Sequence, residues 1–315
     1  MTRVVVVGDV MVDVVARLVG PVAPGSDSEA SVSFGGGGSA ANVAAWLAFA
    51  GCPAVFVGRV GGDERGVSAA EALRAAGVDA RLIVDGEQPT GTCVVLVSPG
   101  GERSMLPDPG ANSALMPEDV PDSLLGPGGH LHITGYSLVR AGPRPAALSA
   151  MSRAVEAGMT VSVDPSSAAL LSPSFLELLD GVGLLLPNAE EAAALTGLAD
   201  VAAALGALAV RFPEVVVKLG AEGTMWTDGS DELRVPAVAL SGGAVDTTGA
   251  GDAFAAGLLA ARFGGAAPAE ALAAGCALAA QAVVTPGARP PRSGERRFPP
   301  TAAHDAAAQP PGQGD

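Results

Sequence analysis

Basic residues are scarce in this chain. Of its 315 residues only 18 are Lys or Arg, against 33 Asp or Glu, so the formal net charge is −15. A chain this acidic offers no general positive footprint to a nucleic acid or an anionic membrane surface. We therefore expect neither as a partner. Any anion that binds must be small and held by local features such as backbone amides.

Cysteine and histidine are equally rare. The three cysteines, Cys52, Cys93 and Cys276, lie far apart, which excludes both a CxxC metal motif and a disulfide framework. Only three histidines occur, so a zinc site is not expected.

Long apolar runs are missing as well. The nearest approach to a membrane span, residues 271–284, is interrupted by Gln281 and Pro286 before it reaches the roughly 20 residues that a span needs. The N-terminus reaches Gly8 and Asp9 directly after four valines, too early for the apolar region of a signal peptide. We expect a cytoplasmic protein.

The chain does contain short β-branched runs that alternate with longer alanine- and leucine-rich stretches. This alternation predicts an α/β fold with a doubly wound, mostly parallel sheet flanked by helices. The predicted strands are residues 3–8, 54–58, 131–134, 160–164, 183–186 and 214–218. The predicted helices are residues 40–50, 66–76, 144–157, 190–196, 201–211, 250–263 and 268–284.

Two stretches, residues 14–34 and 80–106, break the alternation with short alternating segments and turn residues. We interpret them as a small antiparallel sheet, inserted twice beside the main domain, that forms a lid over the carboxyl edge of the central sheet. Apolar residues on this lid, Val32 and Phe34 among them, predict that it pairs two chains into a homodimer. The main domain is expected to span residues 1–288, and the Pro-rich residues 289–315 to form a disordered tail.

The most informative segment reads DTTGAGDAF over residues 246–254. Gly249, Ala250 and Gly251 open an apolar helix, whose free N–H groups and dipole make an anion hole. Asp252, in the first turn, could take a proton from a hydroxyl that attacks a phosphoryl group. The alternative is a helix cap with glycines for tight packing, but Asp246 and Asp252 on either side favour catalysis.

A second glycine-rich segment, GGGGSAAN over residues 35–42, lies between a strand-like stretch and an apolar helix. Its glycines permit close approach of a ligand to the backbone, and Asn42 adds an amide. The same residues satisfy the GxGxxG/A pattern, so a dinucleotide-dependent oxidoreductase is an alternative. Against it, the segment lies in the second β–α unit, and the first acidic residue downstream is Asp63. A Walker motif is absent, because Lys218 is followed by Leu219.

Polar side chains also follow two predicted strands. Asp9 and Asp13 come after the first strand and suit hydrogen bonds to sugar hydroxyls, with a capped turn as the alternative. Asn188 and Glu191 open a helix at N-x-x-E spacing. Glu191 is either a capping-box residue or acts through magnesium-bound water on the phosphates of a nucleotide, and spacing alone leaves both open.

In this order the segments resemble the ribokinase-like (PfkB) family of carbohydrate and nucleoside kinases. The resemblance extends from Gly8 to about Ala288 and includes GGGGSAANVA at 35–44, GRVGGD at 58–63, PGAN at 109–112, Asp-Pro at 164–165 and KLGAEG at 218–223. It implies a ribokinase-like fold and an ATP-dependent phosphotransferase that uses ATP and Mg²⁺.

The resemblance also implies roles for individual residues. Asp252 would be the general base, with the anion hole at residues 249–251. The residues implied for the acceptor are Asp13, Gly37, Gly38 and Asn42. Those implied for the nucleotide and magnesium are Asn188, Glu191, Lys218, Gly220 and Gly223. A potassium-type monovalent-cation site would involve Asp246, Thr248 and Gly287, although Pro290 and Pro291 depart from the family pattern there.

The acceptor is either a ribose-, fructose- or ketodeoxygluconate-like sugar or a nucleoside such as adenosine. The segment at 35–42 lacks the lysine of ribokinase proper and is closer to the GGSAAN form of some nucleoside kinases. Aromatic residues, however, make up only 3% of the chain, which disfavours base stacking. Tyr136 is expected to line the acceptor pocket. Arg103, on the lid, either meets the carboxylate of an acidic sugar or is solvated.

Overall fold

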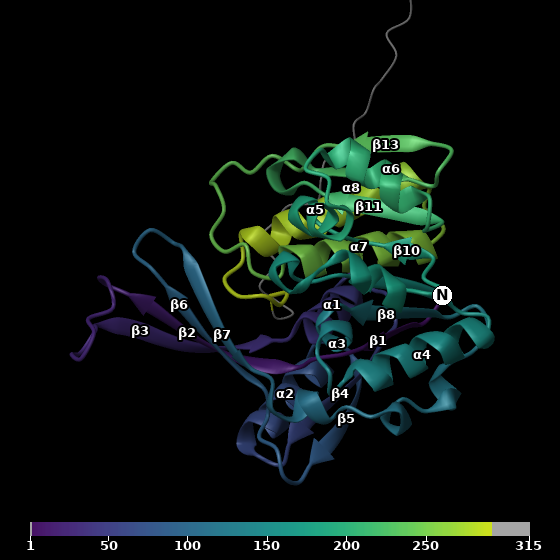
Figure 1. The fold of residues 1–315 in the computed structure, drawn as a ribbon. Coiled ribbons are helices and arrows are strands. Elements are labelled where there is room, and N and C mark those ends of the chain that lie inside the picture. The colour runs from purple at the N-terminus through teal and green to yellow at the C-terminus, as the bar shows by residue number, and fades with distance from the viewer. Residues whose placement is uncertain (1, 292–315) are drawn as a thin grey trace, which may run out of the picture.

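The computed structural model describes residues 2–291, so the predicted tail lies outside it except for its first three residues. The described chain forms one sheet of nine strands and one of four (Figure 1). The α/β prediction with a separate lid sheet is confirmed.

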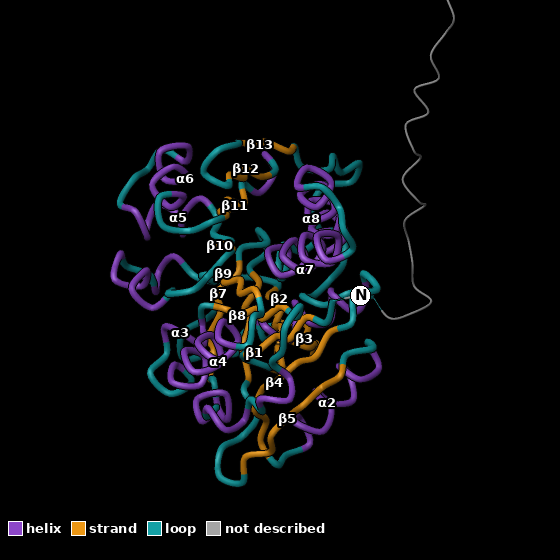
Figure 2. The backbone as a smooth tube through the Cα atoms, turned by 90° about the vertical axis from the view of Figure 1, so that its right-hand side faces the viewer, coloured by secondary structure: helices purple, strands orange, loops and turns teal. Residues whose placement is uncertain are grey.

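The central sheet runs between two layers of helices (Figure 2). β1 (Val4–Val7) is a run of four fully buried valines, because a strand covered on both faces has no solvent side. The order across the sheet is β13 (Glu232–Val235), β12 (Thr224–Thr227), β11 (Glu214–Lys218), β10 (Leu184–Leu185), β9 (Thr160–Asp164), β8 (His130–Thr134), β1, β4 (Ala54–Gly61) and β5 (Asp79–Asp85). All neighbours are parallel except the β11–β12 and β12–β13 pairs, an edge hairpin that the sequence analysis did not predict.

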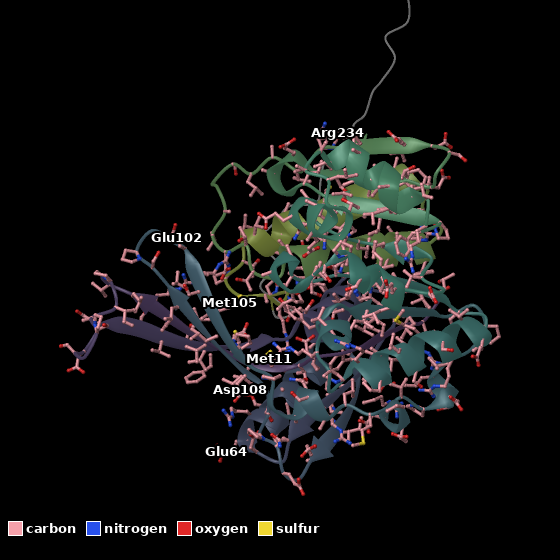
Figure 3. The ribbon with its side chains drawn as sticks, viewed as in Figure 1. Met11, Glu64, Glu102, Met105, Asp108 and Arg234 are labelled. Atoms are coloured by element: carbon pink, nitrogen blue, oxygen red, sulfur yellow. The ribbon has the colours of Figure 1, made fainter. Side chains whose placement is uncertain are left out.

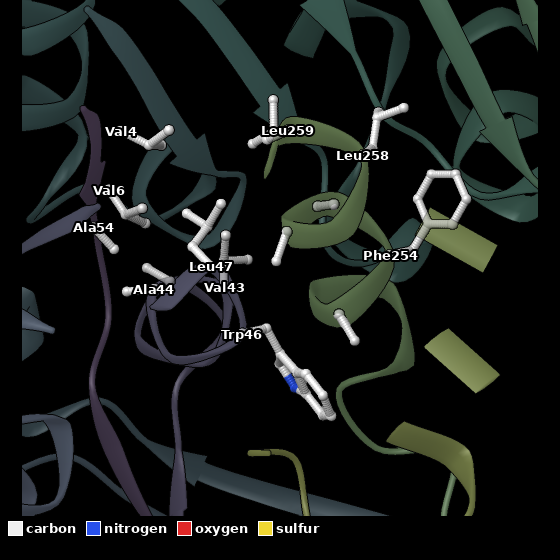
Figure 4. Packing of buried hydrophobic residues seen from close by; sticks show 14 of the residues in the cluster. Val4, Val6, Val43, Ala44, Trp46, Leu47, Ala54, Phe254, Leu258 and Leu259 are labelled. Atoms are coloured by element: carbon white, nitrogen blue, oxygen red, sulfur yellow. The ribbon is translucent and has the colours of Figure 1, made fainter. Parts of the chain in front are cut away.

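Alternate residues of β1 face the two helical layers. Val4 and Val6 pack into one core and Val5 and Val7 into the other, because successive side chains of a strand point to opposite faces. The first layer holds α1 (Ser39–Phe49), α2 (Glu64–Ala75), α7 (Ala250–Phe263) and α8 (Pro268–Val283), and the second holds α4 (Arg144–Glu156), α5 (Ala189–Thr196) and α6 (Val201–Ala209). Figure 4 shows residues of both helices in the first core, Leu47 of α1 and Leu259 of α7 among them. This packing brings the first turns of α1 and α7 together.

The four-stranded sheet projects from the body as a lid (Figure 1). Its order is β3 (Ala30–Gly37), β2 (Met11–Leu18), β6 (Thr92–Val97) and β7 (Arg103–Asp108). Figure 3 shows Met11 where the lid meets the body and Met105 farther out on β7.

Two details of the lid prediction are wrong. Residues 80–85 belong to β5, where they pair with β4 of the central sheet, so the second lid segment begins only at β6. The lid is also mixed rather than antiparallel, because β2 and β6 pair in parallel while β3 and β7 flank them in antiparallel pairs. Both inserted segments thus leave the body in the same direction, and their outgoing strands meet at the centre of the lid.

Within residues 2–291 no single helix is long and apolar enough to cross a membrane. α5 and α6 pass the same test only together, as a pair bent by 61°.

Candidate active site

A cavity of about 630 Å³ lies between the inner face of the lid and the carboxyl edge of the central sheet. It is lined from both sides and collects most of the predicted site residues. From the predictions these are Asp13, Gly38, Asn42, Arg103, Tyr136, Asn188, Glu191, Lys218, Gly220, Thr248, Gly249, Gly251 and Asp252. Segments separated by more than 200 residues therefore meet at one cavity.

Asp252 lies in the first turn of α7 and faces α1. The hydroxyl of Ser39 donates to its Oδ1 over 2.7 Å, and the amide of Asn42 donates to its Oδ2 over 2.9 Å. Burial raises the pKa of Asp252 to about 7, although both hydrogen bonds favour the ionised form and act against this rise. Ser39 was not predicted as a site residue. Its signal was its place three residues before Asn42, on the same face of a helix.

Arg289 fixes the orientation of the Asn42 amide. Its Nε donates to Asn42 Oδ1 over 3.3 Å, and its Nη2 donates to the carbonyl of Gly37 over 2.9 Å. Because a guanidinium can only donate, the oxygen of the amide must face Arg289, and the NH₂ group must face Asp252. The assignment of Arg289 to a disordered tail is therefore wrong. The Trp46 indole, which donates to the carbonyl of Ala288 over 2.9 Å, holds this stretch against α1.

The predicted anion hole forms the N-terminus of α7. Gly249 caps the helix in the left-handed region at φ 75°, and a Cβ there would lie 2.5 Å from the carbonyl oxygen of Ala288. Both the backbone angle and the close approach require glycine at this position. The Ala250 N–H donates to the carbonyl of Thr247 over 3.3 Å and is thus used within the loop. A Cβ on Gly251 would lie 3.5 Å from Nζ of Lys218, so a cation borders the start of the helix.

The two carboxylates after β1 have different surroundings. Asp9 accepts hydrogen bonds from the N–H groups of Ser39 (3.1 Å) and Ala40 (3.2 Å) and thereby caps the start of α1. Asp13 extends from β2 into the cavity, and burial raises its pKa to about 6, although the charge of Arg289 lowers it. Gly37 leaves room for Asp13, because a Cβ on Gly37 would lie 2.1 Å from its Oδ1.

Tyr136 begins the short helix α3 (Tyr136–Val139) and lines the cavity as predicted. Burial, followed by the negative charges of Asp9 and Asp252, raises its pKa to about 12. The phenol is therefore neutral at physiological pH.

Asn188 and Glu191 form a capping box at the start of α5. Each side chain accepts from the backbone N–H of the other over 2.8 Å, so the structural alternative from the sequence analysis holds, and both residues also line the cavity. Burial raises the pKa of Glu191 to about 7, against the charge of Lys218, which lowers it.

Lys218 pairs with Asp164 across the sheet, at the carboxyl ends of β11 and β9, the two strands that flank β10. Its Nζ lies 2.5 Å from Asp164 Oδ2. Burial alone would lower the pKa of Lys218, but the charges of Asp164 and Glu191 outweigh it and leave the pKa raised. Asp164 belongs to the family resemblance but had no predicted role, although its place at the end of a predicted strand is a signal for a site residue. Gly223 does not line the cavity. It packs against β13, where a Cβ would lie 2.0 Å from the carbonyl oxygen of Val235.

The residues predicted for a monovalent cation also lie together, but their carboxylate, Asp246, is already paired with an arginine. Asp246 accepts hydrogen bonds from the backbone N–H and the hydroxyl of Thr248 (3.0 and 2.7 Å) and from the N–H of Gly287 (3.1 Å). Arg103 of β7 reaches the same carboxylate and donates to it. The solvated alternative for Arg103 is therefore wrong, whereas its contact with an acidic sugar stays a prediction.

Sequence comparison assigns the chain to a family. The whole of residues 1–293 matches the pfkB family carbohydrate kinase. The protein belongs to this PfkB family. This PfkB kinase is 36% identical over 269 residues to the ATP-dependent ribose-1-phosphate kinase of Halopiger xanaduensis, a match that covers 82% of this chain and 84% of that protein. It is 32% identical over 273 residues to a fructokinase of Klebsiella pneumoniae, covering 82% and 83%.

A solved structure has the same architecture. The adenosine kinase of Sinorhizobium meliloti superposes with a TM-score of 0.83 at 30% identity, covering 92% of this chain and 96% of that one. The predicted ATP-dependent carbohydrate kinase is confirmed at the level of the family. The dinucleotide alternative is wrong, because the glycine run ends a lid strand paired antiparallel to β2, outside the central parallel sheet.

Proposed function

We propose that this PfkB kinase transfers the γ-phosphoryl group of ATP to a hydroxyl of a small sugar, with Asp252 as the general base. The position of Asp252 carries the proposal: a half-buried carboxylate in the first turn of α7, held by Ser39 and Asn42, on the wall of the cavity that Asp13 also enters. With a pKa of about 7, this carboxylate is a stronger base than an ordinary aspartate, and a large share of it is ionised at neutral pH.

An acceptor hydroxyl between Asp252 and the start of α7 would meet the base and the anion hole together. As its oxygen bonds to the γ-phosphorus, its proton passes to the Asp252 carboxylate. The bond from the γ-phosphorus to the bridging oxygen breaks, and ADP leaves. The backbone N–H groups of Gly249 and Gly251 would stabilise the charge on the transferring oxygens, since this reaction depends mostly on positioning and charge stabilisation.

ATP is expected to bring Mg²⁺, which neutralises phosphate charge when it is bound. Across residues 2–291 no group of three or more His, Cys, Asp or Glu side chains is arranged as a metal site. Few carboxylates at the cavity, Glu191 among them, are enough for magnesium. This ion keeps several waters and takes one or two carboxylates beside the substrate phosphates. Glu191 would accept hydrogen bonds from those waters. The monovalent cation implied by the resemblance does not fit while Arg103 pairs with Asp246, and no step above uses it.

A nucleoside is the second candidate acceptor, and the similarity to an adenosine kinase supports it. Among the described residues that line the cavity, Tyr136 is the sole aromatic side chain, which provides a nucleobase with one stacking surface. Asp13 and Asn42, in contrast, suit hydroxyl groups. These contacts favour the sugar.

The proposal is tested by measuring ADP release with ATP, Mg²⁺ and a panel of ribose, fructose, 2-keto-3-deoxygluconate, ribose 1-phosphate and adenosine. We expect turnover of a sugar or sugar phosphate, and a loss of roughly 10²–10⁴ in rate with normal ATP binding in Asp252→Asn. Asp180→Asn is the matched control, because that side chain is 94% exposed. No turnover of any acceptor, or a near-normal rate in Asp252→Asn, would contradict the proposal.

A further inference from the structure

The inner face of the lid carries two arginines in one row. Arg17 of β2 pairs with Val97 of β6, which pairs with Arg103 of β7, so these three side chains project from the same face of the sheet. Asp13 lies four residues before Arg17 on β2 and therefore shares that face, which looks onto the cavity.

Both arginines approach a single carboxylate on the body. Arg103 donates to Asp246 and to the hydroxyls of Thr247 and Thr248. Arg17 Nη2 lies 3.9 Å from the other oxygen of Asp246, whose side chain is only 10% exposed. Figure 1 shows the lid extending beside the chain between β13 and α7, which contains these three body residues.

The residues around Asp246 do not fit a potassium ion in this arrangement. One carboxylate oxygen already accepts from Arg103 and from Thr248, and the other accepts from the N–H of Gly287. An N–H is a donor and cannot ligate a cation, whereas the guanidinium supplies the positive charge that the carboxylate requires.

We propose that Arg103 takes the place of the monovalent cation, so that closing the lid delivers the positive charge to Asp246. The carboxylate lies only three residues before Gly249, in the loop that leads into the anion hole. Left unpaired, its negative charge opposes the binding of an anion at the start of α7 and loosens the loop. With Arg103 in place, the loop is neutral and fixed, and this state exists only when the lid covers the cavity.

Arg103 is in this sense a positioning residue. Its expected effect on the rate rests on the proposed function. The contact between Arg103 and Asp246 does not depend on that function, and it can be tested without substrate. A cation that binds the folded protein specifically raises its melting temperature. Potassium should therefore stabilise a variant whose Asp246 has lost the directly bonded guanidinium of Arg103, and leave the intact protein unaffected.

The experiment compares the full-length protein with Arg103→Met in KCl, NaCl and choline chloride at equal ionic strength. Arg234→Met is the matched control: Arg234 is an exposed residue of β13, at the far end of the molecule from the lid (Figure 3). In the intact protein and the control we expect equal melting temperatures and equal rates in all three salts. In Arg103→Met we expect a rate roughly tenfold lower in choline, with KCl restoring much of it and raising the melting temperature.

Arg103→Lys and Arg103→Gln separate charge from shape if methionine prevents folding. The lysine variant should stay independent of potassium, and the glutamine variant should become dependent on it. Potassium-specific stabilisation of the intact protein would overturn the inference, as would an Arg103→Met or Arg103→Gln protein that no monovalent cation stabilises. Absence of turnover in every protein and salt would instead count against the proposed function, because the melting temperatures are read without substrate.

Discussion

The side-chain NH₂ group of Asn42 donates a hydrogen bond to Oδ2 of Asp252 over 2.9 Å, and the side-chain oxygen of Asn42 accepts one from Arg289. One amide thus joins the proposed base to a buried guanidinium, in a fixed orientation. The arrangement keeps two donors, Asn42 and Ser39, directed at the Asp252 carboxylate, which favours its ionised state.

The pH dependence of kcat/KM should follow Asp252. Below its pKa of about 7 the side chain carries a proton and cannot accept another, so the rate should fall by roughly tenfold per pH unit towards acid. Ser39→Ala removes a hydrogen bond to the ionised form and should shift this limb to higher pH. A profile between pH 5 and 9 measures both, and an unchanged limb in Ser39→Ala would count against Asp252 as the titrating base.

Arg289→Met should lower kcat while leaving the KM for ATP close to its original value. Without the donor on its oxygen, the Asn42 amide can rotate away from Asp252, and misplacing a base costs roughly tenfold or more in rate. The acidic limb of the pH profile of kcat/KM should also move to higher pH. Arg234→Met serves as the control on the exposed surface. A loss confined to stability, with kcat and the acidic limb unchanged, would leave Arg289 without this role.

Gly37→Ala should weaken acceptor binding. The new Cβ would lie 2.1 Å from Oδ1 of Asp13, so the carboxylate must move out of its place in the cavity. Gly35→Ala on the same strand is the matched control, because a Cβ there meets nothing within 4 Å. We expect kcat/KM for the acceptor to fall about tenfold or more in Gly37→Ala alone. Equal kinetics in the two variants would show that Asp13 does not hold the acceptor.

The outer face of the lid should pair two chains. Phe34 is 76% exposed and Leu106 54%, and the strand register puts both on the face opposite Asp13, together with Val94. An apolar patch of this kind is commonly covered by a partner. Light scattering at tens of micromolar should therefore report about twice the chain mass of 30.7 kDa.

Phe34→Asp should shift that mass towards the monomer, whereas Val210→Asp on the body should not, although Val210 is 90% exposed. A monomer at these concentrations would refute the pairing and leave the lid itself in place.

The sequence alone determined the features that depend on neighbouring residues. The valine run of β1, the bounds of α7 and the anion-hole loop at residues 249–251 were predicted because strand burial and helix N-termini are properties of contiguous segments. Asp252, the proposed base, was singled out for the same reason, since it belongs to the first turn of that helix. The lid was predicted in outline, but its second boundary was wrong, because β5 carries the same period as a lid strand and only its pairing with β4 distinguishes it.

Only the tertiary structure decided which side chains meet across the fold. Arg289 and Asn42 are 247 residues apart, and Arg103 and Asp246 are 143 apart. Nothing in the local pattern around Arg289, a Pro-rich stretch, or around Arg103, an alternating lid segment, indicates these partners. A hydrogen bond or an ion pair depends on where two atoms come to lie, and that position is set by the packing of α1 on α7 and by the direction in which the lid leaves the sheet.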